Sequence, residues 1–130
     1  MNNERALVFL AEDDQDDQIT FLEALIEVNL AIEVKIFENG FSLLEGLANG
    51  KPPSLIILDL NMPRLNGLET LTELKKNEEL KDIPKLVWST SENSEVKYAC
   101  IQQGANGYFE KPDTFSGLLV TIEDMMKWIA

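Results

Sequence analysis

Short apolar runs alternate along the chain with stretches in which apolar residues recur at helical spacing. The runs predict strands at Ala6–Ala11, Ile32–Ile36, Leu55–Leu58, Lys85–Trp88 and Gly107–Glu110. The intervening stretches predict helices at Asp16–Asn29, Phe41–Leu47, Leu68–Asn77, Ser94–Gln103 and Phe115–Ile129. Strands that alternate with helices favour a doubly wound α/β fold, with a five-stranded parallel sheet and helices on both faces.

Two of these helices have a predicted buried face. In the first it consists of Ile19, Leu22, Leu25 and Ile26, and in the last of Leu118, Leu119, Ile122 and Met126. The last helix also carries Met125, Trp128 and Ile129, which is more apolar surface than one buried stripe requires. This surplus leaves homodimerisation or another partner open.

Composition narrows the classes of protein. The 130 residues suit a single domain over 1–130, with no output domain. One cysteine and no histidine exclude a disulfide framework, a histidine-based triad and histidine-ligated zinc. We interpret Cys100 as a buried, small apolar residue. The net charge of −12 argues against nucleic-acid binding, and no apolar run reaches the length of a membrane span or a signal peptide, so we expect a cytoplasmic protein.

Polar residues come directly after four of the predicted strands. They are Glu12, Asp13 and Asp14 after the first, Asp59 after the third, Ser89 after the fourth and Lys111 after the fifth. The carboxyl ends of parallel strands share one edge of the sheet, where ligands bind. Clustered carboxylates suit Mg²⁺, and a carboxylate beside that metal can accept a phosphoryl group. A lysine and a hydroxyl can then hold the phosphoryl oxygens.

Four motifs resemble the receiver domains of response regulators in bacterial two-component signalling. They are Leu10–Asp14, Leu58–Pro63 with Gly67, Trp88–Ser91 and Gly104–Pro112. The resemblance covers essentially the whole chain and is to stand-alone regulators, such as the chemotaxis and phytochrome-associated ones. It implies the flavodoxin-like strand order 2-1-3-4-5.

The resemblance also implies roles for individual residues. Asp59 corresponds to the phosphoacceptor, and Lys111 to the lysine that pairs with the phosphoryl group. Ser89 corresponds to the switching hydroxyl, and Tyr108 to the aromatic that turns inward with it. The implied ligands of Mg²⁺ or Mn²⁺ are Glu12, Asp13, Asp59 and Asn61, with Glu12 acting mainly through metal-bound water.

The implied partners are a sensor histidine kinase, a histidine phosphotransfer protein and a downstream protein target. Since the chain has no histidine, the phosphodonor must be another molecule. The phosphorylated protein would return to the resting state by autodephosphorylation.

Four other interpretations are less favoured by the same residues. A receiver-like interaction module that works without phosphorylation would have the same fold. A haloacid-dehalogenase-type phosphatase expects an aspartate at the position of Asn61, and a flavodoxin-like carrier expects a neutral phosphate loop after the first strand. A calcium loop over Glu12–Glu23 would need glycine at the position of Asp17.

Overall fold

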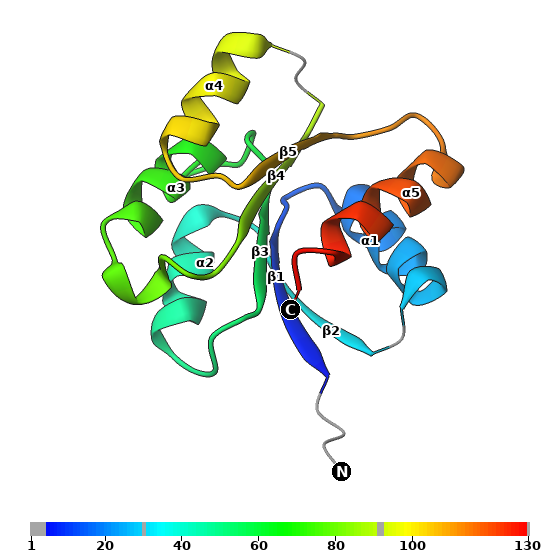
Figure 1. The fold of residues 1–130 in the computed structure, drawn as a ribbon, viewed down its shortest axis with the longest axis horizontal. Coiled ribbons are helices and arrows are strands. Elements are labelled where there is room, and N and C mark those ends of the chain that lie inside the picture. The colour runs from blue at the N-terminus through cyan, green and yellow to red at the C-terminus, as the bar shows by residue number, and fades with distance from the viewer. Residues whose placement is uncertain (1–4, 30, 91–92, 130) are drawn as a thin grey trace.

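The computed structural model describes residues 5–29, 31–90 and 93–129 as an α/β fold (Figure 1). The strands are β1 Ala6–Ala11, β2 Ile32–Phe37, β3 Leu55–Leu58, β4 Lys85–Ser89 and β5 Gly107–Glu110. The helices are α1 Gln15–Val28, α2 Gly40–Ala48, α3 Gly67–Lys75, α4 Ser94–Gln102 and α5 Phe115–Met126. All strand pairs are parallel, in the order β2-β1-β3-β4-β5. The predicted fold class and strand order are confirmed.

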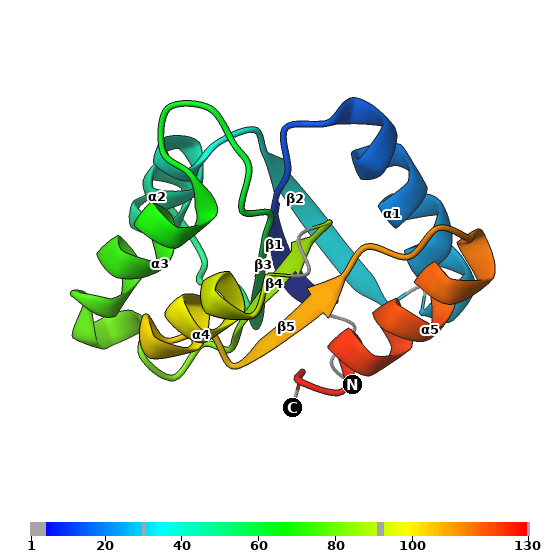
Figure 2. The same cartoon turned by 90° about the horizontal axis from the view of Figure 1, so that it is seen from above.

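The sheet separates two hydrophobic cores. Figure 2 shows α1 and α5 on one face and α2, α3 and α4 on the other. Alternate residues of the central strands point to opposite faces, so Phe9 and Ile56 pack with the α2–α4 layer, whereas Leu10 and Ile57 pack with the α1/α5 layer. Because β1, β3 and β4 are buried on both faces, β1 and β3 consist entirely of apolar residues and β4 is apolar between Lys85 and Ser89.

Each of the five α-helices begins after a residue that caps it with a side-chain oxygen. The caps are Asp14, Asn39, Asn66, Asn93 and Thr114. An N-cap oxygen satisfies a backbone N–H that the first turn leaves without an intrahelical partner. For α1, the Asp14 carboxylate accepts from the backbone N–H of Asp17 at 3.0 Å. This cap fixes how α1 leaves the end of β1.

The predicted buried face of α1 is wrong in two positions. Ile19 and Ile26 are 54% and 61% exposed, and the residues that α1 buries are Phe21, Ala24 and Leu25. Apolar residues occupy more than one stripe of this helix. Packing against the sheet and α5 selects the stripe that contains Phe21, whose ring meets Trp88 of β4 edge-on at a centroid distance of 5.3 Å.

In α5 the prediction is partly confirmed. Leu118 and Ile122 are buried as expected, and Leu119 and Met126 are partly buried against the same core. Met125, however, is fully buried, so it adds nothing to a surplus apolar surface. Trp128, 40% exposed, follows the end of the helix.

At the edge of the sheet opposite the strands' carboxyl ends, Lys85 holds the start of β4. Its buried ammonium donates to the backbone oxygens of Leu80 (2.7 Å) and Ile83 (2.8 Å). Leu80 ends a short 3-10 turn at Glu78–Leu80, which the sequence pattern did not predict. Its backbone N–H donates to Asn106 Oδ1 at 2.8 Å, and its carbonyl accepts from the Asn106 N–H at 2.7 Å. Burial lowers the pKa of Lys85.

Among residues 5–29, 31–90 and 93–129, no helix has the length and apolar character needed to cross a bilayer. Location in the cytoplasm stays a prediction of the sequence.

Candidate functional site

Three carboxylates converge where β1 and β3 end. One carboxylate oxygen from each of Glu12, Asp13 and Asp59 lies within 4.8 Å of the other two. Glu12 and Asp59 are buried and Asp13 is exposed. They belong to an open cleft of about 470 Å³ lined by Glu12, Asp13, Asp14, Asp17, Asp59, Asn61, Thr90 and Lys111. The predicted gathering of acids at this edge is therefore observed.

Asp59 is held from both sides by backbone. Its N–H donates to the carbonyl of Ala11 at 2.9 Å, which fixes it against the end of β1. On the other side α3 begins at Gly67, whose N–H donates to the carbonyl of Leu60 at 3.0 Å. A Cβ at position 67 would overlap the backbone oxygen of Asp59, so this close approach requires glycine. The position of Asp59 is set by these tight contacts.

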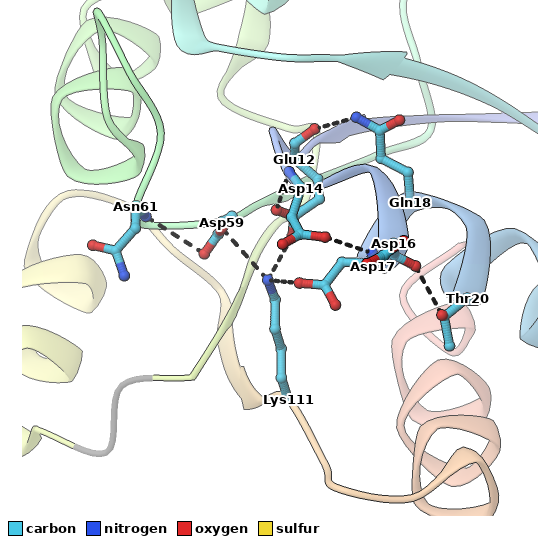
Figure 3. A network of polar contacts seen from close by, with 9 residues as sticks. All are labelled: Glu12, Asp14, Asp16, Asp17, Gln18, Thr20, Asp59, Asn61 and Lys111. Carbon is cyan, nitrogen blue, oxygen red and sulfur yellow. Dashed lines mark hydrogen bonds and ion pairs between the residues drawn. The ribbon is translucent and has the colours of Figure 1, made fainter.

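Lys111 reaches into the acids from the end of β5 (Figure 3). Its backbone N–H donates to the carbonyl of Ser89 at 2.8 Å. Its ammonium lies 2.6 Å from Glu12 Oε1, 2.8 Å from Asp17 Oδ2 and 3.4 Å from Asp59 Oδ2. The same nitrogen lies 4.7 Å from the ring centroid of Trp88, within the range of a cation–π interaction.

The charged groups in this cluster shift one another's pKa values. The pKa of Glu12 is raised to about 7, chiefly by burial and also by the charge of Asp59, while Lys111 acts in the opposite direction. Burial alone would lower the pKa of Lys111, but its hydrogen bonds to Asp17 and Glu12 and the negative charges of Glu12 and Asp59 raise it overall. Lys111 is consequently a fixed positive charge at neutral pH, whereas Glu12 titrates there.

The donor set at the acid cluster fits a hard divalent cation. Glu12, Asp13 and Asp59 offer only oxygen, which is the ligand type that Mg²⁺ and Mn²⁺ take in proteins. Asn61 lines the same cleft, and its backbone N–H lies 3.4 Å from Asp59 Oδ1.

Neither of the two predicted switch residues is among the residues that line this cleft. Ser89 ends β4 and is fully buried, and the residue of this segment that lines the cleft is Thr90. Tyr108 is half-buried on β5, packed against the α2–α4 core. Ser91, the last residue of the motif around Ser89, lies outside the described residues.

The sequence analysis missed the contact between Asp17 and Lys111. The sequence pattern assigns Asp17 no role beyond breaking a calcium loop over Glu12–Glu23. The two residues are 94 positions apart, and they meet only because α1 and the end of β5 lie at the same edge of the sheet. Position at the start of the first helix was the only available signal.

Comparison with known families matches residues 8–123 to the response regulator receiver domain. The chain belongs to this family. Among curated relatives, the response regulator Rcp1 of Synechocystis sp. is 30% identical over 128 residues, covering 94% of this chain and 87% of that protein. The receiver domain is a phosphorylation-operated switch of two-component systems, and such domains interact with sensor kinases and downstream targets.

Solved structures agree with this assignment. The phosphorylated cyanobacterial phytochrome response regulator RcpA superposes with a TM-score of 0.88 at 31% identity, covering 96% of this receiver domain and 94% of that chain. The Mn²⁺-bound form of Rcp1 superposes with a TM-score of 0.85 at 30% identity, covering 95% and 94%. Receiver domains bind divalent metal, which accords with the oxygen-only cluster found here.

Proposed function

We propose that Asp59 is the phosphoacceptor of this receiver domain. The observation that carries the proposal is the placement of Asp59: a buried carboxylate beside two other acids, with the Lys111 ammonium 3.4 Å away. No other described aspartate combines burial, a neighbouring lysine and a place in the open cleft. A partner phosphohistidine can reach it through that cleft.

Glu12, Asp13, Asp59 and Asn61 would hold Mg²⁺ or Mn²⁺. Support comes from their oxygen donors in one cleft and from the relative Rcp1, whose structure was solved with Mn²⁺. When bound, the cation neutralises negative charge on the transferring phosphoryl group.

In the transfer step, a carboxylate oxygen of Asp59 forms a bond to phosphorus. The phosphorus–nitrogen bond of the phosphohistidine breaks, and its electron pair leaves with the imidazole. Lys111 supplies a positive charge for the phosphoryl oxygens, since its raised pKa keeps it protonated. Autodephosphorylation reverses the modification when water attacks the same phosphorus and releases phosphate.

Ser89 and Tyr108 are the proposed switch. Support comes from the register of β4 and β5, in which Val87 pairs with Tyr108 and Ser89 pairs with Glu110. A displacement at the end of β4 would therefore pass directly to β5. A few kcal/mol of new phosphoryl contacts suffice to shift such a two-state equilibrium.

We further propose a sensor histidine kinase as donor, with a histidine phosphotransfer protein and a downstream protein as further partners. The description of RcpA as a phytochrome response regulator supports a kinase of the phytochrome type. We propose that this domain signals by protein contact, as a monomer or a homodimer.

The test is the intact mass of the purified protein after incubation with phosphoramidate or acetyl phosphate and Mg²⁺. We expect one phosphoryl adduct on the original protein. The adduct should be absent when EDTA removes Mg²⁺, and absent in the Asp59→Asn variant. The matched control is Asp16→Asn, which removes one exposed carboxylate outside the acid trio and should keep the adduct. A folded protein that gives no adduct, or an Asp59→Asn variant that still gives one, would contradict the assignment and favour a phosphorylation-independent interaction module.

A further inference from the structure

The Lys111 ammonium is shared unequally among three acids. Its three N–H donors are directed to Glu12, Asp17 and Asp59, and the contact to Asp59 is the longest, at 3.4 Å. The two short contacts, 2.6 and 2.8 Å, both go to residues at the start of α1 or just before it. The ammonium is therefore held on the α1 side of the cleft.

Asp17 is suited to hold Lys111 there. Its backbone N–H is fixed by the Asp14 cap in the first turn of α1, and its carboxylate points toward the Lys111 ammonium (Figure 3). Its side chain is 39% exposed, against none for Glu12. An ion pair with this much exposure contributes little to folding stability. The more important consequence of this ion pair is the position that it gives the Lys111 ammonium.

We propose that Asp17 is a positioning residue that draws the Lys111 ammonium toward α1 and thereby limits it to the longer, 3.4 Å contact with Asp59 in the unphosphorylated protein. The inference rests on the proposed role of Asp59 as phosphoacceptor. A phosphoryl group on Asp59 must compete with the Asp17 carboxylate for one of the three N–H donors of the ammonium. Asp17 thereby restrains phosphorylation and lowers the fraction of protein phosphorylated at a given donor concentration.

Replacing the carboxylate by an amide tests this directly. In Asp17→Asn the ammonium keeps Glu12 but loses its second short ion pair, so it is free to approach Asp59. With Mg²⁺ at saturation, we expect initial phosphorylation by phosphoramidate to be about two- to five-fold faster, the range that an exposed ion pair supplies. Asp17→Glu retains a carboxylate and should restore most of the original rate.

The neighbouring residue provides a matched control. Asp16 lies in the same first turn, is exposed, and contributes its backbone carbonyl to a hydrogen bond from Thr20 at 2.8 Å. Asp16→Asn thus makes the same change in net charge and in the charge at the helix N-terminus, without touching Lys111. Its rate should stay at the original value.

A second measurement follows Lys111 without any phosphodonor. Because the ammonium lies 4.7 Å from the Trp88 ring centroid, Trp88 emission reports its position. In a Trp128→Phe background and without metal, Asp17→Asn should change the emission and Asp16→Asn should not. Lys111→Met should abolish the difference between the two aspartate variants.

Equal rates and equal emission for the two asparagine variants would overturn the proposal. So would a slower Asp17→Asn variant at saturating Mg²⁺. If the original protein takes up no phosphoryl group, the assignment of Asp59 fails, and with it the competition proposed here. If the original protein is phosphorylated and only the Asp17 variants behave like the control, the failure belongs to Asp17 alone.

Discussion

Replacing Lys111 by methionine should expose how strongly the acid cluster depends on one positive charge. Methionine keeps an unbranched apolar side chain against Trp88 but removes the ammonium. Glu12, whose side chain is fully inaccessible, is then left with the acids Asp13 and Asp59 as charged neighbours. Removing one partner of a buried ion pair leaves an uncompensated charge in a poorly solvated position.

The size of the effect follows from burial. The Lys111–Glu12 pair is 2.6 Å long, with side chains 10% and 0% exposed, so its disruption should cost about 3 kcal/mol. The bridge to Asp17, which is 39% exposed, adds at most about 1 kcal/mol. We expect a loss of about 3 to 4 kcal/mol in the free energy of unfolding when Glu12 is ionised.

The loss should depend on pH. The pKa of Glu12 is already raised to about 7 from 4.5. Ionisation of Glu12 therefore lowers the free energy of unfolding as pH rises through the window between these two values. Without Lys111 this pKa rises further, which widens the window. Lys111 itself, with a folded pKa above its unfolded value, stays protonated across this window, so the pH dependence comes from the ionisation of its partner Glu12. The variant should therefore lose about 1 kcal/mol near pH 5.5 and the full amount near about pH 8.5.

Urea unfolding in EDTA, followed by circular dichroism at both pH values, measures this. Glu12→Gln and the double variant complete a mutant cycle. In the double variant the buried charge is gone, so the loss should be well below the sum of the two single losses. Additive losses, or a Lys111→Met cost that is the same at both pH values, would refute the electrostatic account.

Three further outcomes are expected. Gly67→Ala should lower stability by about 1 to 3 kcal/mol and slow phosphorylation, since its Cβ overlaps the Asp59 backbone; a thermal melt with unchanged Tm would contradict this. In a Trp128→Phe background, Trp88 emission should change on Mg²⁺ addition and again on phosphorylation, and a flat titration would count against the observed contact with Lys111. Cys100, fully buried and with a pKa raised by burial, should react with iodoacetamide only on unfolding; rapid labelling of the native protein would show an accessible thiol.

The positions of the strands could be predicted because burial on both faces leaves a direct record in the sequence. Leu55–Leu58 contains only aliphatic residues, and the acid that follows marks the end of the strand. The gathering of Glu12, Asp13 and Asp59 could be predicted as well, because parallel strands end at a common edge.

The buried face of α1 could not be predicted in the same way. Ile19, Phe21, Leu25 and Ile26 are distributed around the helix, and periodicity alone does not say which stripe meets α5 and the sheet. The contact of Asp17 with Lys111 has a related cause. It depends on the spatial relation between the first helix and the last strand, which no local pattern encodes.

The anchoring of Lys85 has a mechanical consequence. The amino end of β4 is bound on one side to the turn at Leu80 and on the other to Asn106, through four hydrogen bonds of 2.7 to 2.8 Å. The other end of the strand lies at the cleft, beside Thr90. Because β4 is also paired with β3 and with β5, it cannot move at the cleft alone. We therefore expect a displacement at Ser89 to be taken up by the paired strands, while the end at Lys85 stays in place.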